Sequence, residues 1–324
     1  MSADRKKIVV IGGGSGSSVA LRGLKSYDVD LTAVVTMFDS GGSTGILRDE
    51  FGYPPLGDIR QCLVALSPEE NERVAAFNSA LDFRFDSSSS LQGHSVGNLV
   101  LAALTTVYQG VQGAIDEMSR MMQLQGEVLP VTLDEAHLCA KLIDGQVIRT
   151  ESAIDLRGGN GPGIDHIFLD ADVEANPRAL DAIVEADAIL LGPGDLYTSV
   201  IPNLLVDAIS NAIRDTEAPV IYACNLMTKL GETDGYSCSV FAGELVRYIG
   251  SRKIDYLLAN TGTFSDEVLR GYADELAAPV ELDNGDTEKY AREIVFSDLA
   301  WIDGAKVRHN SDTLARIVMS TVNL

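Results

Sequence analysis

Short apolar runs alternate with glycine-rich turns at the start of the chain. Residues 8–11 form a β-branched apolar run, residues 12–16 are glycine except for one serine, and residues 19–24 have helical spacing. A second apolar run, residues 31–36, leads into a second glycine-rich turn at residues 39–45. This order of strand, loop, helix and strand predicts an α/β protein with a Rossmann-like, doubly wound and mostly parallel sheet.

The same pattern recurs in the second half of the chain. Residues 188–191, 220–223 and 256–259 are continuous apolar stretches, and residues 204–214 and 241–249 between them have helical spacing. Strands without polar alternation are typical of a parallel sheet that helices cover on both faces.

The stretch from about residue 68 to residue 125 is different, because helical spacing dominates it, with one polar break at residues 87–90. We predict a helical insertion packed on the sheet, within a single domain of residues 1–324. Three further short strands either extend the sheet or form a small second one: residues 128–132, 136–141 and 147–150.

Composition and charge narrow the class of protein. The 324 residues include 47 acidic and 25 basic side chains, a net charge of −22, and 46% are hydrophobic. This balance is typical of a globular protein and excludes disordered and fibrous classes. The acidic excess argues against nucleic-acid binding, because too few cations are present to displace counterions.

Location and redox state follow from the apolar runs and the cysteines. No apolar run reaches the ~18 residues of a membrane span, and the short apolar run after a polar start does not fit a signal peptide. Cys62, Cys139, Cys224 and Cys238 have no Cys-x-x-Cys spacing, which argues against a zinc site or a redox dithiol. We expect a cytoplasmic protein with reduced cysteines packed in its interior.

Candidate chemistry lies in the loops after the predicted strands, because open parallel sheets bind ligands there. The first loop, Gly12 to Gly16, departs from the dinucleotide fingerprint, since Ser17 stands where the third glycine belongs, and it is not a Walker A loop. Its glycines still let backbone N–H groups approach an anion at the start of the next helix. The alternative is a tight turn without a ligand.

The second loop carries Asp39, then Gly41 and Gly42, with Ser43 beyond them. Asp39 lies near the place where an acidic residue binds a ribose hydroxyl in dinucleotide folds, and a divalent cation is another partner for it. The glycines permit positive φ, and Ser43 or Thr44 can cap the following helix. A turn held by local hydrogen bonds alone is the alternative.

Two further segments hold candidates that also have a structural explanation. Asp58 and Arg60 follow a pair of prolines, and they either bind a ligand or serve as a helix cap and a surface cation. His94 and Asn98 are four residues apart, so both project from one face near a helix start. A structural role is the alternative for this pair as well.

Polar loops also follow three later strands. Residues 192–199 are rich in glycine and hydroxyl groups, residues 225–229 follow the next strand, and residues 260–261 the one after. Together with the first two loops they predict one long polar groove at the edge of the sheet, of the kind that a nucleotide needs.

These segments resemble, in collinear order, the YvcK family of gluconeogenesis factors (UPF0052), relatives of the 2-phospho-L-lactate transferase CofD. The matching segments are residues 12–16, 36–45, 55–60, 93–98, 192–199, 202–203, 225–228, 231–233 and 307–309. The resemblance implies a CofD-like fold, a cytoplasmic location and binding of a UDP-sugar such as UDP-N-acetylglucosamine. It also implies roles in cell shape, envelope growth and growth on gluconeogenic carbon, with no reaction firmly assigned to this branch.

The first functional hypothesis is therefore a regulatory protein that senses a UDP-sugar. Both glycine loops would hold phosphates, Asp39 the ribose or a phosphate-bound cation, and Asn225 or Thr228 the base or sugar. Arg308 would neutralise the diphosphate, because the guanidinium fork suits phosphate oxygens. The candidate ligand-binding residues are Gly12, Gly13, Gly14, Ser15, Gly16, Asp39, Gly41, Gly42, Ser43, Asp58, Arg60, His94, Asn98, Gly192, Pro193, Gly194, Tyr197, Thr198, Asn203, Asn225, Met227, Thr228 and Arg308.

The second hypothesis is a CofD-type enzyme that moves a phospholactyl-like group from a nucleotide diphosphate, with Asp39 binding Mg²⁺ and His94 orienting the acceptor. Two departures from the family pattern argue against it. Ser40 stands where a second acidic residue is usual, which weakens a two-carboxylate metal site, and residues 56–61 replace the Ser-Pro-Asp-x-Asp-Thr segment of the transferase branch. An NAD-linked protein is a third hypothesis that rests on the fold alone. We further expect a protein partner in envelope synthesis and a homo-oligomer.

Overall fold

Twelve strands and the helices around them make up the described part of the chain. The computed structural model describes residues 5–42, 45, 47–48, 52–69, 71–86, 91–159, 161–273, 276–283, 286–304 and 306–322. The strands are β1 (Lys6–Gly12), β2 (Val29–Val35), β3 (Glu127–Pro130), β4 (Leu138–Leu142), β5 (Val147–Arg149), β6 (Ile164–Leu169), β7 (Ala188–Leu191), β8 (Val220–Ala223), β9 (Ile254–Asn260), β10 (Ala291–Ser297), β11 (Ala300–Asp303) and β12 (Lys306–His309). The helices are α1 (Gly14–Leu24), α3 (Gly57–Leu66), α4 (Glu72–Asp82), α5 (Val96–Val107), α6 (Val111–Met122), α7 (Glu151–Asp155), α8 (Pro177–Val184), α9 (Ile201–Leu204), α10 (Asp207–Asp215), α11 (Cys238–Tyr248), α12 (Asp266–Ala273) and α13 (Ser311–Val322), with the short turns η1 (Leu196–Val200) and η2 (Thr287–Lys289).

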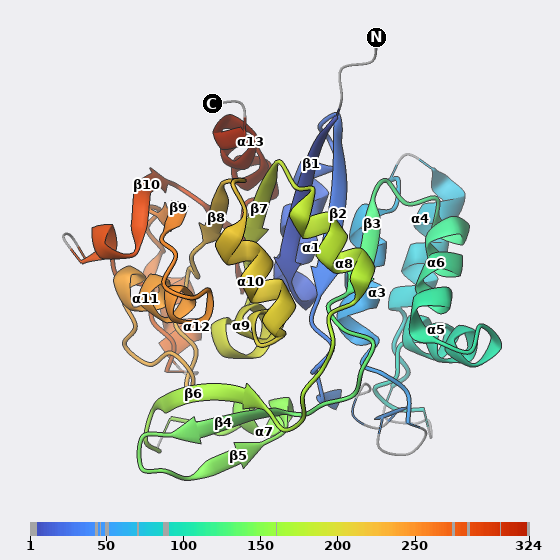
Figure 1. Cartoon of the computed structure of the whole chain (residues 1–324), viewed down its shortest axis with the longest axis horizontal. Coiled ribbons are helices and arrows are strands. Elements are labelled where there is room, and N and C mark those ends of the chain that lie inside the picture. Colours follow the sequence, from blue (N-terminus) through green and yellow to red (C-terminus); the bar gives the residue numbers. More distant parts are fainter. Residues whose placement is uncertain are drawn as a thin grey trace.

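The central sheet has seven strands in the order β10-β9-β8-β7-β1-β2-β3. Every neighbouring pair is parallel. The chain moves outward from β1 through β2 to β3, and outward on the other side from β7 to β10, so the order reverses between β1 and β7. Figure 1 shows α8 and α10 in front of the sheet and α1 and α13 behind it. The predicted doubly wound, mostly parallel α/β fold is confirmed.

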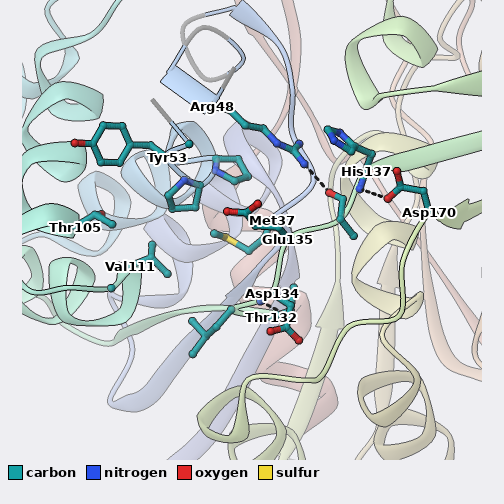
Figure 2. A pocket seen from close by; sticks show the side chains of 16 residues that line it. Met37, Arg48, Tyr53, Thr105, Val111, Thr132, Asp134, Glu135, His137 and Asp170 are labelled. Carbon is teal, nitrogen blue, oxygen red and sulfur yellow. Dashed lines mark hydrogen bonds between the residues drawn. The ribbon is translucent and has the colours of Figure 1, made fainter. Parts of the chain in front are cut away.

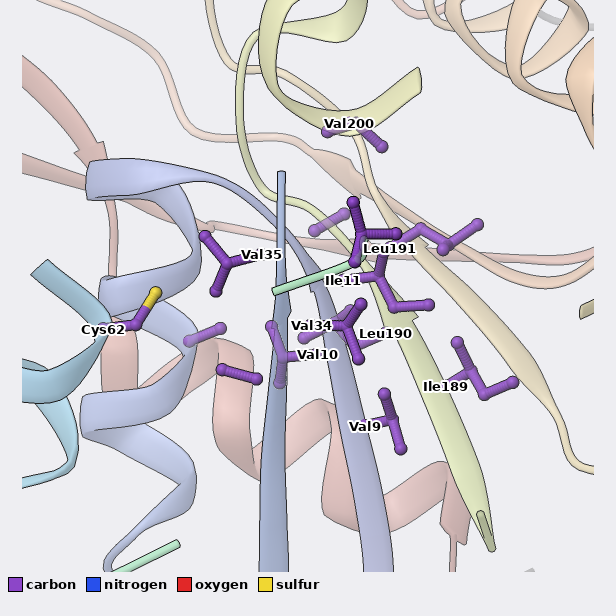
Figure 3. Packing of buried hydrophobic residues seen from close by; sticks show 14 of the residues in the cluster. Val9, Val10, Ile11, Val34, Val35, Cys62, Ile189, Leu190, Leu191 and Val200 are labelled. Carbon is purple, nitrogen blue, oxygen red and sulfur yellow. The ribbon is translucent and has the colours of Figure 1, made fainter. Parts of the chain in front are cut away.

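The core lies along the middle of this sheet. Every residue of β7 and β8 is buried, as the continuous apolar runs predict. Figure 3 shows Val10 and Ile11 of β1 beside Leu190 and Leu191 of β7, and none of these four side chains is exposed to solvent. Burial of this kind stabilises the fold by roughly 1.5–3 kcal/mol per large aliphatic side chain. The loops at the ends of β1 and β7 therefore start from the buried middle of the sheet.

The three short predicted strands divide between two sheets. β3 pairs with β2 and extends the central sheet, whereas β4 and β5 form a small antiparallel sheet with β6, in the order β5-β4-β6. β6 was not predicted from the sequence. In Figure 1 the small sheet lies below the carboxyl ends of the central strands, which run from top to bottom.

The predicted helical insertion corresponds to α4, α5 and α6. Asn71 caps α4 by accepting the N–H groups of residues 73 and 74, and Ser95 caps α5 by accepting the N–H of Asn98. These caps satisfy donors that a helix start leaves unpaired. The polar break at residues 87–90 lies outside the described residues.

Two helix predictions are corrected by the structure. The first helix begins at Gly14 instead of residue 19, because the packing of the glycine run against a neighbouring loop overrides the low helix propensity of glycine. The helix predicted over residues 204–214 is interrupted, since Val206 has an extended backbone (φ −83°, ψ 104°) between α9 and α10. All four cysteines are buried and unoxidised, as expected. No helix within the described residues is long and apolar enough to cross a membrane.

Candidate functional site

A cavity of about 880 Å³ lies at the carboxyl ends of the central strands. The loops after β1 and β7 form its floor, at the point where the strand order reverses, which is where doubly wound sheets bind ligands. Predicted residues that line it are Gly13, Gly14, Ser15, Gly16, Asp58, Pro193, Gly194, Asn225, Met227, Thr228 and Arg308. Of the strand-end loops predicted to form one groove, those after β1, β7 and β8 line this open cavity, whereas Asp39, Gly41 and Asn260 do not.

The first glycine loop is shaped by close contacts with the loop after β7. Gly14 has a positive φ of 48°, which an L side chain rarely adopts. A Cβ on Gly16 would lie 2.6 Å from the carbonyl carbon of Pro193. The side-chain N–H of Asn203 donates to the Gly12 carbonyl at 3.2 Å. The glycines are therefore required by backbone packing as well as by any ligand, and the first turn of α1 faces the cavity.

The loop after β8 forms the opposite wall. Asn225 donates its side-chain N–H to the Gly194 carbonyl at 3.0 Å, which joins this loop to the loop after β7. Thr228 exchanges two hydrogen bonds with Ala278, from its backbone N–H at 2.7 Å and to its hydroxyl at 2.9 Å. Met227 is held nearby by a bridge to Pro279. Both loops are fixed by their own hydrogen bonds before any ligand arrives.

Arg308 and His309 reach the cavity from β12, which pairs only with β11 among the described strands. The Arg308 Nη1 lies 3.4 Å from the Ser15 hydroxyl, directly at the first turn of α1. His309 Nε2 is 3.0 Å from the carbonyl oxygen of Cys224. Burial lowers the pKa of His309 to about 4, so its ring is neutral at pH 7 and donates this hydrogen bond.

Lys229 is a cation of the cavity that the sequence analysis did not single out. It forms ion pairs with Asp155, with Asp195 at 2.7 Å and with Glu232 at 2.8 Å. Burial lowers the pKa of Lys229, but the charges of Glu232 and Asp195 outweigh burial and raise it. Asp155 ends α7, so this cluster joins the small sheet region to the core.

Asp58 occupies the position next to the glycine loop. It lies in the first turn of α3 without capping it, and its carboxyl group faces Gly13 and Gly14, accepting the Gly14 N–H. Burial, followed by the charges of Asp39 and Asp195, raises the pKa of Asp58 to about 7. A carboxyl group near half protonation therefore lies where an anionic ligand would meet the backbone N–H groups.

Asp39 has a carboxylate neighbour from a distant part of the chain. Glu151 at the start of α7 accepts the Ser40 N–H at 3.2 Å, while Asp39 accepts the Gly41 N–H at 2.8 Å. Burial and the charge of Asp39 raise the pKa of Glu151 to about 8. The second acidic group that Ser40 removes from the local sequence is thus present from elsewhere in the chain.

Several predicted residues do not line the cavity: Gly12, Asp39, Gly41, Gly42, Arg60, His94, Asn98, Gly192, Tyr197, Thr198 and Asn203. Arg60 lies under Gly97 and forms an ion pair with Asp82, so it joins α3 to the insertion. His94 and Asn98 are buried at the start of α5. Tyr197 is buried, with its hydroxyl 2.9 Å from that of Tyr236.

Ser43 and Thr44 lie outside the described residues. The cavity residues that the sequence analysis did not name as candidates include Asp155, Asp195, Ser199, Lys229, Tyr272 and His309. Asp195, Ser199, Lys229 and His309 fall inside segments that it did quote, so position after a strand could have found them. Asp155 and Tyr272 had no such signal.

A second cavity of about 500 Å³ lies farther along the sheet edge, between the segment before α3 and the loop after β3 (Figure 2). Arg48 donates to the Ala136 carbonyl at 2.8 Å, and the His137 N–H donates to Asp170 at 2.8 Å. These two hydrogen bonds connect the loop after β3 to Arg48 and to Asp170. Among the predicted ligand-binding residues that the structure describes, none lines this cavity.

The buried carboxyls give the fold a pH dependence. Asp58 and Glu232 both have a pKa of about 7 because of burial, against ordinary values of 3.8 and 4.5 in the unfolded chain. Between these values the folded protein keeps protons that the unfolded chain releases. We therefore expect the free energy of unfolding to fall as pH rises from about 4.5 to about 7, by up to about 1.4 kcal/mol per pH unit and group.

Urea unfolding at several pH values measures this slope, which the combined change Asp58→Asn and Glu232→Gln should reduce. The raised pKa of Glu151 and the lowered pKa of His309 continue to act in opposite directions in that variant. Glu185→Gln is the control, because Glu185 is exposed and its pKa is lowered by Lys7. A wild-type stability that stays constant or rises over this window contradicts the assignment.

Comparison with known proteins agrees with the fold. Residues 8–300 match the family described as 2-phospho-L-lactate transferase CofD. The gluconeogenesis factor of Bacillus subtilis is 38% identical over 316 residues, which are 97% of this chain and 98% of that protein. A protein of Nostoc sp. is 43% identical over 97% of this chain and 68% of its own length. A crystal structure of a UPF0052 family member from Bacillus halodurans superposes with a TM-score of 0.92 at 38% identity, covering 97% of this chain and all of that one.

The fold and the position of the cavity define a Rossmann-like α/β protein with its cavity at the switch point of a doubly wound sheet. The chain belongs to the CofD family, and within that family to the gluconeogenesis-factor branch, YvcK or UPF0052.

Proposed function

We propose that the cavity at the switch point binds a UDP-sugar of the UDP-N-acetylglucosamine type. The protein would act as a cytoplasmic regulator that passes the ligand state to a partner in envelope growth and cell shape. The observation that carries the proposal is that the glycine-rich start of α1 and the Arg308 guanidinium lie on the same cavity, with Arg308 3.4 Å from Ser15. Backbone N–H groups, a helix N-terminus and a planar cation together suit a diphosphate.

The size and walls of the cavity also support a nucleotide ligand. About 880 Å³ lies within the range of ordinary small-molecule pockets. Away from the glycine loop and Arg308, the cavity wall contains both polar and apolar residues, with Tyr272, Met227 and Leu226 among the less polar ones. Such a wall suits a base or a sugar ring, and Asn225 and Thr228 are the neighbouring polar groups.

Thermal unfolding with UDP-N-acetylglucosamine, GDP, GTP and NAD, each with and without Mg²⁺, tests the proposal. A ligand at about 100 times its Kd stabilises the fold by about 2.7 kcal/mol, which is an easily measured shift. Trp301 is the only tryptophan in the chain and pairs with Arg308 across the β11–β12 hairpin, so its fluorescence provides a second readout. A shift with guanine nucleotides alone would favour the CofD-type transferase, and no shift with any UDP-sugar would refute the proposal.

A regulatory protein leaves its ligand unchanged, whereas a transferase consumes it. We therefore expect phosphorus NMR of UDP-N-acetylglucosamine to remain the same after long incubation with the protein and Mg²⁺. Release of a nucleoside monophosphate or diphosphate would identify an enzyme instead.

We expect Mg²⁺ to have little effect on UDP-sugar binding, with a change in Kd below about threefold on chelation. Asp39 and Glu151 share one region, and burial followed by the charge of Asp39 raises the pKa of Glu151 to about 8, so Glu151 is largely protonated at pH 7. A weakly charged pair attracts a divalent cation less than two free carboxylates do. Calorimetric titration with EDTA and with Mg²⁺ measures the effect, and loss of all binding in EDTA would establish a metal site at these carboxylates.

A further inference from the structure

We propose that Cys224 and Cys238 form a peroxide-responsive dithiol, in which a hydroperoxide converts the two thiols into a disulfide bond that weakens ligand binding at the cavity. The formation of the bond is independent of the proposed function. Its effect on UDP-sugar binding rests on that function.

The two sulfur atoms are already in contact. Cys224 directly follows β8, Cys238 is the first residue of α11, and their Sγ atoms are 3.6 Å apart. A disulfide bond has an S–S length of about 2.05 Å, so the sulfurs must approach by roughly 1.5 Å. Within the described residues no such sulfur contact is found for Cys62 on α3 or Cys139 on β4, which makes those two cysteines natural controls.

A small cavity leads to this pair. It has a volume of about 180 Å³, and Cys238, Asp283, Leu282 and Phe296 are among its walls. Leu282 and Phe296 are 39% and 53% exposed, so the cavity reaches the molecular surface. Hydrogen peroxide is little larger than water, which takes about 30 Å³. Glutathione disulfide, a pair of tripeptides, does not fit. The small size of the cavity therefore favours a small hydroperoxide as the oxidant.

The positions of the thiols assign their roles. Cys238, the first residue of an α-helix of 11 residues, lines the small cavity and Cys224 does not, so a peroxide in that cavity meets Cys238 first. The hydrogen bond with Cys238 and burial raise the pKa of Cys224, so Cys224 stays protonated. The Asp283 carboxylate lines the same cavity and accepts the Ser239 N–H at 3.0 Å, so its negative charge lies beside the reacting sulfur and a slow reaction is expected.

The chemistry is a two-electron oxidation. The Cys238 thiolate attacks one oxygen of the peroxide, the O–O bond breaks, and the leaving hydroxide takes a proton to form water. The Cys224 sulfur then attacks the resulting sulfenic acid, the S–S bond forms, and the hydroxyl group leaves as water with the thiol proton. In sum, two thiols and one hydrogen peroxide give one disulfide and two waters.

The disulfide bond would alter the ligand cavity through the contacts of Cys224. Its carbonyl oxygen accepts the hydrogen bond of His309 at 3.0 Å, and His309 is adjacent to Arg308. Asn225, the next residue along the chain, lines the cavity and donates to Gly194. Pulling Cys224 toward α11 therefore displaces contacts on both sides of the ligand cavity.

Formation of the bond is tested in the folded Cys62→Ala/Cys139→Ala variant, in which only the pair remains. We expect hydrogen peroxide to lower the mass by about 2 Da and to remove both titratable thiols, with dithiothreitol restoring them. Glutathione disulfide at the same concentration should react at least about tenfold more slowly. Peptide mapping of the oxidised wild-type chain gives the same information without any substitution.

Mass gains that show sulfinic or sulfonic acid, or thiol loss no faster than global unfolding, would overturn the proposal. Equal reaction with glutathione disulfide would overturn the assignment of the oxidant.

The coupling is tested by titrating UDP-N-acetylglucosamine into the reduced and oxidised proteins. We expect the oxidised wild type to bind at least about fivefold more weakly, and peroxide-treated Cys238→Ala to keep the affinity of its reduced form. Equal affinity in both redox states would refute the coupling alone. A disulfide that forms in a protein binding no UDP-sugar in either state would refute the proposed function and leave the redox pair standing.

Discussion

Replacing Arg308 with alanine is expected to weaken UDP-sugar binding by about tenfold to a hundredfold. Arg308 lies at the first turn of α1, where its Nη1 is 3.4 Å from the Ser15 hydroxyl. The neighbouring carboxyls Asp58, Asp155 and Asp195 oppose an incoming diphosphate, so a local cation has a large effect. Hydrogen bonds to charged groups contribute on the order of 1.5–3 kcal/mol, which corresponds to this range of affinity.

Calorimetric titration measures the effect, with circular dichroism to confirm the fold. Arg308→Lys should recover only part of the affinity, because lysine lacks the planar fork. Arg316→Ala is the matched control: it removes the same charge from an exposed position on α13, away from the cavity. A loss below about twofold in Arg308→Ala, or an equal loss in Arg316→Ala, would show that Arg308 does not contact the phosphates.

Adding one methyl group at Gly16 is expected to weaken UDP-sugar binding by at least about tenfold and to lower the melting temperature. A Cβ at this position would overlap the Pro193 carbonyl group, 2.6 Å from its carbon, and would lie 2.9 Å from the Gly194 Cα. These are backbone atoms that cannot rotate away, so the start of α1 must separate from the loop after β7. Overpacking of this kind costs about 1–3 kcal/mol.

Gly271→Ala provides the comparison for Gly16→Ala. A Cβ on Gly271 would meet nothing within 4 Å, and the residue lies within α12, so this change should leave stability the same or raise it by up to about 1 kcal/mol. Thermal unfolding measures the stability of both variants, and calorimetric titration measures their affinity for the UDP-sugar. Wild-type affinity in folded Gly16→Ala would mean that the spacing of the two loops does not control the ligand site.

The central strands could be predicted because burial on both faces leaves a direct trace in the sequence. The apolar runs at residues 188–191 and 220–223 coincide with β7 and β8. β6 has no such trace, since Asp165 and His166 interrupt its apolar positions and its sheet is small and partly exposed. The early start of α1 could not be predicted either, because the close contacts of the glycine run, Gly16 with Pro193 and Gly14 with Asp58, join segments far apart in the sequence.

The residues of the candidate site could likewise be predicted only in part. Residues within two positions of a strand end, such as Gly13, Pro193 and Asn225, could be placed at the cavity because topology brings strand ends to one edge. The Lys229–Asp155 ion pair joins residues far apart in the sequence, and no local pattern marks such a contact. The four-residue spacing of His94 and Asn98 predicts that they share one helix face, but α5 begins only at Val96, so His94 precedes the helix and Asn98 lies within it.

Arg308 belongs to a ribbon of only two strands, β11 and β12, that is separate from the central sheet. A two-stranded ribbon has little stability of its own. Its contacts with the rest of the protein include the Val307 N–H to the Tyr272 hydroxyl at 2.7 Å and the His309 bond to Cys224. Local opening of such a segment requires less free energy than global unfolding. Arg308, one of the cations of the cavity, therefore lies on a segment that opens more readily than the core of the protein. A ligand held by Arg308 would lower the frequency of that opening, so ligand binding would order this part of the surface.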